Sequence, residues 1–251
     1  TIMAGLVLKE LKLRGLVTRT LIVGPGHLQD QWQREMMEKF GEHFVQVNRI
    51  VINSHWGRNA WLDYPQIITS MDFAKQDDVL DTLKDARWDL VIVDEAHKLA
   101  AYRYGESVKK TDRYKLGEAI ASRTRFLLML TATPHRGDPE NFRLLLDLLE
   151  PNFFSSTAFL EQAVRDGDNP LFLRRLKEDL CDFDGRPLFP PRHVTTLKYS
   201  LSERERQLYN AVTTYVQEHM DKALRENRRN VAFAMLVLQR RLASSVRALR
   251  D

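Results

Sequence analysis

The chain has 251 residues, 43% hydrophobic and 29% charged, which is ordinary for a globular protein with one good core, or one domain and an appendage. Its single cysteine, Cys181, excludes an internal disulfide and a cysteine-based zinc cluster, and it fits a reducing, cytoplasmic location. No apolar run reaches the length of a membrane span and no signal peptide is visible, so we expect no membrane contact.

The positive charge is concentrated in the C-terminal segment. Residues 1–200 contain 28 Lys and Arg against 28 acidic residues, whereas residues 201–251 contain 10 against 6. A basic helical tail favours contact with a phosphate backbone, although for any single arginine a solvated helix face is the preferred interpretation.

The first 131 residues alternate between short apolar runs and amphipathic stretches. Helices are expected at 2–14, 27–40 and 72–86, and strands at 20–23, within 44–52, and at 66–69, 88–94 and 126–131. This alternation indicates βαβ units, and therefore an α/β fold with a parallel sheet sandwiched by helices.

The pattern changes to mainly helical after Pro139. Helices are expected at about 140–149, 157–166 and 170–180, followed by a proline-rich passage and a strand at 193–199. Ser202 and Glu205 form a capping-box pattern that opens a long helix, and a second helix follows the polar break at 226–230. We therefore predict two domains, an α/β lobe at 1–200 and a helical hairpin at 201–251.

Two carboxylates follow the apolar run at 90–93, in the sequence Asp94-Glu95-Ala96-His97. Ligands bind at the carboxyl edge of an open α/β sheet, and adjacent acids there favour a Mg²⁺-nucleotide. Asp94 would then hold the metal, and Glu95 would orient and deprotonate the attacking water. The alternative is a strand followed by an N-capping aspartate and a helix-starting glutamate.

A second polar group follows the expected strand at 126–131, where Thr131 and Thr133 stand in the sequence Thr-Ala-Thr-Pro. On its own this sequence is also a plausible turn with hydroxyl-to-backbone hydrogen bonds. Neighbouring strand ends meet at one edge of a sheet, so we expect these hydroxyls near Asp94 and Glu95. There they can couple the state of a nucleotide to another part of the protein.

The chain resembles the superfamily 2 helicase-like ATPases in several segments. Asp94–His97 resembles motif II and residues 130–137 motif III. Residues 21–25 with Leu28, Gln31 and Trp32 resemble motif Ia, and residues 68–72 motif Ib. Residues 173–180 and Leu201-Ser202 through Tyr209 resemble the Swi/Snf-type branch. Residues 239–245 resemble bacterial members related to the RNA-polymerase-associated translocase and to anti-phage helicases.

The resemblance implies a RecA-like P-loop NTPase lobe that uses ATP and Mg²⁺. The family opens with a phosphate loop, and Thr1 resembles the last residue of that loop, so we expect a fragment without most of it. Thr1 and Asp94 would hold the metal through the nucleotide, Thr1, Asp94 and His97 would contact the nucleotide, and Gln31 is a weaker candidate. The arginine finger and the second RecA-like lobe are also absent.

The resemblance also implies partners. Pro25, Thr69 and Ser70 would contact the phosphate backbone of double-stranded DNA, and Arg240 and Arg241 are further candidates. For Arg175 and Lys177 we favour ion pairs over DNA contact. The remaining implied partners are the second lobe of the same protein and either RNA polymerase or the subunits of a defence system.

We therefore expect the first ATPase lobe of an ATP-dependent, DNA-stimulated translocase, and little or no ATP hydrolysis by this chain alone. The alternative is a non-catalytic module, derived from such a motor, that binds DNA or protein. A hydrolase built on Asp94 and His97 lacks a nucleophile elbow, and zinc at His97, His135 and His193 lacks the usual ligand spacing.

Loss of the strand that leads to a phosphate loop would expose a sheet edge and apolar surface. We expect the chain to self-associate through that edge or to be poorly soluble, because unpaired backbone groups on an edge strand attract other strands. Light scattering checks this expectation, and a monodisperse monomer would contradict it.

Overall fold

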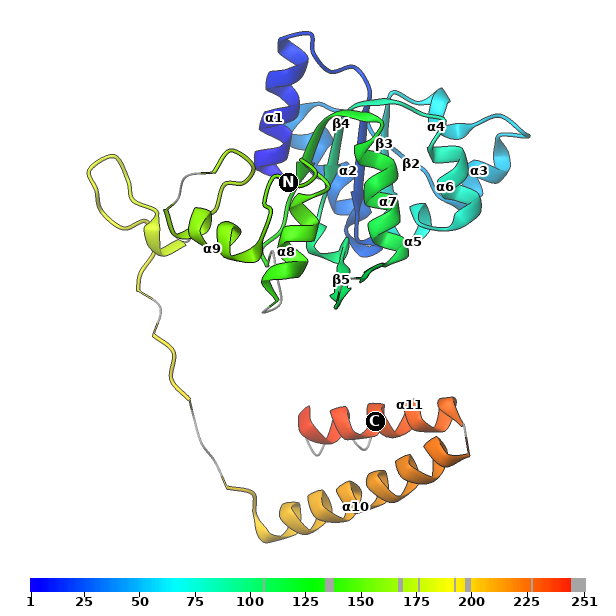
Figure 1. Ribbon diagram of the computed structural model, residues 1–251, viewed down its shortest axis with the longest axis vertical. Helices are drawn as coiled ribbons and strands as arrows, with labels where there is room; N and C mark the ends of the chain where they lie inside the picture. Colours follow the sequence, from blue (N-terminus) through cyan, green and yellow to red (C-terminus); the bar gives the residue numbers. More distant parts are fainter. Residues whose placement is uncertain are drawn as a thin grey trace. The chain divides into compact units, whose positions relative to one another are not determined.

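The computed structural model describes residues 1–105, 107–133, 138–166, 169–175, 177–191, 193–196, 200–226 and 228–244. The chain divides into two compact units, Thr1–Arg174 and Arg175–Asp251 (Figure 1). The predicted domain division at residue 200 stays a prediction. None of the helices in the described ranges has the length and apolar character needed to cross a bilayer.

A five-stranded sheet forms the centre of the first unit. Its strands are β1 (Thr20–Gly24), β2 (Val45–Gln46), β3 (Gln66–Ser70), β4 (Trp88–Val93) and β7 (Thr124–Met129). They lie in the order β2-β3-β1-β4-β7, and all four pairings are parallel. The predicted α/β fold class is therefore confirmed. β7 lies at one edge of the sheet. The predicted self-association through an exposed edge stays a prediction.

Helices pack against both faces of this sheet, because side chains along each strand alternate between them. Ile22 and Ile92 share one core with α1 (Ile2–Leu13) and α2 (Gln29–Phe40). Leu21 and Val91 share the other core with Trp61 of α4 (Ala60–Asp63) and with buried residues of five further helices. These are α5 (Met71–Ala74), α6 (Asp77–Leu83), α7 (Asp112–Ala121), α8 (Pro139–Leu146) and α9 (Thr157–Asp166).

The structure shortens or divides three predicted elements. The helix expected from 27 begins as a 3-10 turn, η1 (Gly26–Leu28), before α2. The helix expected at 72–86 is α5 and α6, separated by Gln76 in an extended conformation. The strand expected within 44–52 is only β2, because Asn48 accepts a hydrogen bond from the Val51 amide (3.1 Å) and starts α3 (Arg49–Ser54).

Several elements of the first unit were not assigned from the sequence. They are α4 (Ala60–Asp63), η2 (Ala96–Lys98), the antiparallel hairpin of β5 (Ala101–Tyr104) and β6 (Ser107–Lys110), and α7. Gly105, with φ of 59°, lies at the turn of the hairpin, and Thr111 caps α7 by accepting from the Tyr114 amide (3.1 Å). These turn and cap residues are signals from which the hairpin and α7 could have been found.

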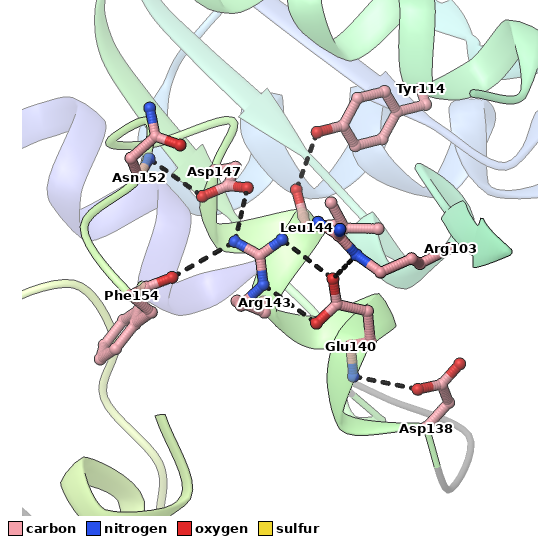
Figure 2. A network of polar contacts seen from close by, with 9 residues as sticks. All are labelled: Arg103, Tyr114, Asp138, Glu140, Arg143, Leu144, Asp147, Asn152 and Phe154. Atoms are coloured by element: carbon pink, nitrogen blue, oxygen red, sulfur yellow. Dashed lines mark hydrogen bonds and ion pairs between the residues drawn. The ribbon is translucent and has the colours of Figure 1, made fainter. Parts of the chain in front are cut away.

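A network of charged groups surrounds Arg143 on α8 (Figure 2). Its guanidinium donates to both carboxylate oxygens of Glu140 (2.9 and 3.0 Å), to Asp147 (3.1 Å) and to the Phe154 carbonyl (3.2 Å). Arg103 of β5 donates to the same Glu140 (2.6 Å). Arg143 is only 7% exposed. The network therefore holds the hairpin, α8 and the following loop together.

A second charged cluster attaches α1 to the rest of the unit. Lys9 and Lys12 both donate to the buried carboxylate of Glu42, and Lys12 also donates to Gln66 of β3 (2.7 Å). Burial alone would raise the pKa of Glu42, but the hydrogen bonds from Lys12 and Lys9 outweigh it and hold that pKa below its usual value.

We expect the Glu42→Gln variant to be less stable than the wild type at neutral pH, and this difference to disappear in acid. A carboxyl whose folded pKa is lowered stabilises the fold above its unfolded pKa, near 4.5, and loses this effect as the pH falls through the folded value. Thermal unfolding at several pH values checks the expectation. Glu38→Gln, at an exposed position of α2, is the control, and a pH-independent difference would contradict the assignment.

The second unit contains two long helices, α10 (Glu203–Arg225) and α11 (Arg229–Ser244), which pack together as the predicted hairpin. The predicted capping box is present: the Glu205 carboxylate accepts from the Ser202 amide (2.9 Å), and the Glu205 amide donates to the Ser202 hydroxyl (3.4 Å). Residues 245–251, the expected end of the second helix, lie outside the described residues.

Two predicted elements, at 170–180 across the boundary of the units and at 193–199 in the second unit, are corrected. The helix expected at 170–180 is wrong: residues 171–175 are irregular, and only a 3-10 turn, η3 (Lys177–Asp179), forms. Asn169 accepts from the Phe172 amide (2.8 Å) as an N-cap residue does, but residues 173–175 and 177–179 are exposed, so no buried apolar face stabilises a helix. Of the strand expected at 193–199, residues 193–196 are exposed and form no strand, and residues 197–199 lie outside the description.

Candidate functional site

The ends of β4 and β7 are joined by hydrogen bonds at the carboxyl edge of the sheet. Val93 pairs with Met129 in the parallel register, the Leu130 amide donates to the Val93 carbonyl (2.8 Å), and the Ala96 amide donates to the Leu130 carbonyl (2.9 Å). The acidic motif and the hydroxyl motif therefore begin side by side. The parallel pairing of their strands places them there although the two motifs are more than 30 residues apart in the chain.

Asp94, the first residue after β4, has both carboxylate oxygens engaged. One accepts from the indole Nε1 of Trp32 (2.8 Å), and the other accepts from the Glu95 amide (2.9 Å). Trp32 lies on α2 and is 2% exposed, so its indole is a fixed donor. The sequence predicts a helix at Trp32 and a motif Ia there but gives no sign of this contact, since 62 positions separate the two residues.

Glu95 adopts a left-handed backbone conformation, with φ of 51° and ψ of 45°. This region costs a residue with a Cβ atom of order 1–3 kcal/mol and occurs preferentially at functional sites. The conformation turns the chain after the strand, just before the 3-10 turn η2. It also argues against the simple alternative of an aspartate cap and a helix-starting glutamate.

His97 joins the two motifs through side chains. Its Nδ1 lies 3.0 Å from the Thr131 hydroxyl and 3.2 Å from the Glu95 carboxylate. The Thr131 hydroxyl also accepts from the Thr133 amide (3.1 Å), so Thr133 lies in a turn closed by Thr131. The structure thus brings together Asp94, Glu95, His97, Thr131 and the exposed Thr133; residues 134–137 lie outside the described residues.

Thr1 is connected to this site through α2. The carboxylate of Glu35 accepts from Gln31 (3.0 Å), and hydrogen bonds from Gln31 and then from Thr1 lower the pKa of Glu35. Because Glu35 and Trp32 lie three positions apart on α2, this helix contacts both Thr1 and Asp94. A metal held jointly by Thr1 and Asp94 stays a prediction.

Of the three candidate DNA contacts in the first unit, Pro25 and Ser70 lie at the sheet edge, whereas the side chain of Thr69 is buried in the strand β3. Gly24 pairs with Ser70 across β1 and β3, so Pro25, the residue after β1, lies at the same sheet edge as Ser70. Pro25 is itself buried, and the backbone that follows it, from Gly26, is exposed. The Ser70 hydroxyl caps α5 by accepting from the Phe73 amide (3.2 Å). Thr69 is fully buried and donates to the Val47 carbonyl (2.9 Å), so its side chain cannot reach DNA in this structure.

The basic candidates of the second unit lie on α11 and in the segment before α10. Arg240 and Arg241 lie on the exposed surface of α11. The Lys177 ammonium lies over the ring of Phe189, 5.3 Å from its centre, so it makes a cation–π contact where an ion pair was expected. Arg175 is exposed.

Comparison with known proteins identifies the family. The SNF2-related domain matches residues 2–248. The chain belongs to the SNF2-related domain family. This SNF2-related domain is 28% identical over 253 residues to the uncharacterized ATP-dependent helicase YqhH of Bacillus subtilis, covering 98% of the chain and 41% of the relative. It is 36% identical over 166 residues to the RNA polymerase-associated protein RapA of Photobacterium profundum, covering 64% and 17%.

The fold of the SNF2-related domain also matches a solved structure. The Sulfolobus solfataricus SWI2/SNF2 ATPase core in complex with dsDNA superposes with a TM-score of 0.52 at 19% identity, covering 97% of this chain and 51% of the other. The resemblance to Swi/Snf-type ATPases and the RecA-like fold are confirmed. The chain spans less than half the length of both sequence relatives named above.

Proposed function

We propose that this SNF2-related domain is the first ATPase lobe of an ATP-dependent, DNA-stimulated translocase. The observation that carries the proposal is the fixed Asp94 carboxylate, held by Trp32 beside a strand end that His97 connects to Thr131. A carboxylate oriented in this way, at the carboxyl edge of a parallel sheet, is suited to a nucleotide-bound cation.

The donor atoms present at Asp94 fit Mg²⁺. Each of its oxygens accepts one hydrogen bond and so retains a lone pair, and carboxylate and hydroxyl oxygens are the ligands that this ion prefers. Asp94, with the hydroxyl of Thr1, would hold the ion, which when bound neutralises phosphate charge. Glu95 would orient and deprotonate water, and His97 would keep Glu95 next to Thr131.

The proposed partners come from the family resemblance. The backbone after Pro25, Ser70 at the sheet edge, and Arg240 and Arg241 on α11 are proposed contacts to the backbone of double-stranded DNA. Thr131 and Thr133 would couple the nucleotide state to these contacts. A second RecA-like lobe would complete the nucleotide site, and RNA polymerase or the subunits of a defence system are the proposed protein partners.

A nucleotide titration tests the proposal. A fluorescent ATP analogue is expected to bind the chain only with Mg²⁺, and Asp94→Asn is expected to remove this Mg²⁺ dependence. ATP turnover, with and without duplex DNA, is expected to stay at background, since an arginine finger alone is worth about 10³–10⁵ in rate. DNA-stimulated turnover would contradict the expected inactivity. Absence of Mg²⁺-dependent binding would favour a non-catalytic binding module.

We expect Trp32→Phe to raise the Mg²⁺ concentration required for half-maximal nucleotide binding by about 10–100-fold. This is the usual loss of metal affinity when a group that orients a metal ligand is removed. The phenyl ring retains most of the buried volume but cannot donate to Asp94. Met36→Leu, at another buried position of α2, is the matched control because it changes packing without touching Asp94. An unchanged Mg²⁺ titration for Trp32→Phe would show that the indole does not position the carboxylate.

A further inference from the structure

The hairpin of β5 and β6 is fixed to the first unit by one of its faces. Because opposite residues of an antiparallel pair share a face, Arg103 and Val108 lie on one side, together with Ala101 and Lys110. Arg103 pairs with Glu140 (Figure 2), Lys110 pairs with Glu118 (2.6 Å), and Val108 packs on the core. This inner face is therefore anchored by charge pairs and apolar contact.

The outer face of the hairpin carries two tyrosines and a lysine. Tyr102 is opposite Lys109, and Tyr104 is opposite Ser107, so all four residues share the side turned away from the anchors. Tyr102 is 39% exposed and Tyr104 is 64% exposed. Within the described part of the chain, the side chains of Tyr102, Tyr104 and Lys109 make no hydrogen bond or ion pair.

The hairpin and its flanks are also strongly basic. Residues 98–115 contain six Lys and Arg against two acidic residues, although residues 1–200 as a whole are neutral. Several of these cations are paired, but Lys98 and Lys109 have no ion-pair partner among the residues that the structure describes. The positive charge of this face therefore favours binding of an anionic polymer.

The hairpin lies beside the proposed DNA contacts. Arg113, three residues after β6, donates to Asp72 (2.7 Å), and Asp72 is in the first turn of α5, which Ser70 caps. The base of the hairpin is thereby tied to the sheet edge that carries Ser70 and Pro25. Tyr102 and Tyr104 are two positions apart on one strand face, about 6.8 Å along the strand, a spacing at which each ring can receive a separate base.

We propose that the outer face of this hairpin binds an unpaired segment of a DNA strand. Two bases stack on Tyr102 and Tyr104, and the intervening phosphates lie near Lys109. Stacking is favoured over phosphate contact alone because the face offers two aromatic rings and one unpaired cation. The inference rests on the proposed function for the presence of DNA, and it adds single-stranded DNA flanking a duplex to the substrate.

Fluorescence anisotropy of the whole 251-residue chain with a labelled oligothymidylate, at fixed low salt and without nucleotide, tests this inference. The double variant Tyr102→Ala, Tyr104→Ala is expected to weaken binding by at least about fivefold, the lower bound for losing one stacked base. Tyr102→Phe with Tyr104→Phe retains the rings and is expected to bind like the wild type. Trp56→Ala removes another exposed aromatic side chain and is the matched control.

Each result distinguishes this inference from the proposed function. Failure of the wild type to bind oligothymidylate, or an unchanged affinity of the alanine variant, overturns the hairpin assignment while leaving Mg²⁺-dependent nucleotide binding as a separate measurement. Equal losses in the alanine and phenylalanine variants would replace stacking with a hydroxyl contact and so overturn the inference. An RNA oligonucleotide that binds while DNA does not would overturn it as well. Circular dichroism verifies that each variant is folded.

Discussion

Replacing Arg143 with alanine is expected to lower the free energy of unfolding of the first unit by about 3–5 kcal/mol, because removal of one partner leaves buried charges uncompensated. Arg143 neutralises Glu140 and Asp147 and satisfies the Phe154 carbonyl (Figure 2). Its hydrogen bonds to Glu140 lower the pKa of that carboxyl, so the pair is ionised at neutral pH. A loss of this size is a large fraction of the about 5–15 kcal/mol that stabilises a typical domain.

Urea unfolding followed by tryptophan fluorescence measures this loss. All four tryptophans, at positions 32, 56, 61 and 88, belong to the first unit, so the signal reports on that unit alone. Arg34→Ala, at an exposed position of α2, is the matched control and is expected to change stability by less than about 0.5 kcal/mol. A similarly small effect of Arg143→Ala would mean that water replaces the guanidinium without cost.

Glu95→Gln is expected to lower ATP turnover by about 10²–10⁴-fold, the usual contribution of a general base. The measurement requires a protein in which this chain is joined to a phosphate loop and a second lobe. Glutamine retains the shape of the side chain and can orient water, but it cannot accept a proton. Nucleotide affinity should change little, and this separates the chemical step from binding. Turnover within about threefold of the wild type would exclude Glu95 as the base.

The same position gives a stability test that needs no activity. Glu95→Asn is expected to stabilise the first unit by about 1 kcal/mol, since asparagine tolerates the left-handed conformation better than glutamate. For a unit of this size the midpoint of thermal unfolding would rise by about 2–4 °C. A decrease would show that the bond between Glu95 and His97 outweighs the backbone strain.

The sequence was informative wherever a local pattern determines the structure. The β-branched run before Asp94 predicted β4, and the strand–helix alternation predicted the parallel sheet. The Ser202–Glu205 capping box predicted the start of α10. Each of these depends on interactions within a few residues, or on a periodicity that directly reflects burial. The convergence of Asp94 and Thr131 was also predictable, because parallel strands carry their carboxyl ends to one edge.

Contacts between distant residues were not predictable in the same way. Nothing in the spacing of Trp32 and Asp94 indicates a hydrogen bond, since the bond depends on how α2 packs across the sheet. The burial of Thr69 depends likewise on the β2–β3 pairing, which places the Val47 carbonyl within reach of its hydroxyl. The helix expected at 170–180 failed although Asn169 accepts from the Phe172 amide as an N-cap residue does, because residues 173–175 and 177–179 are exposed and no buried face stabilises a helix.

The position of His97 has one more consequence. Its Nδ1 lies within reach of two oxygen atoms, that of Thr131 and that of Glu95, yet an imidazole nitrogen carries at most one hydrogen. Donation to the threonine leaves the glutamate free to bind water, whereas donation to the glutamate occupies it. A small rotation of this ring therefore exchanges one acceptor for the other, which would let an event at the end of β7 determine whether the proposed base is available.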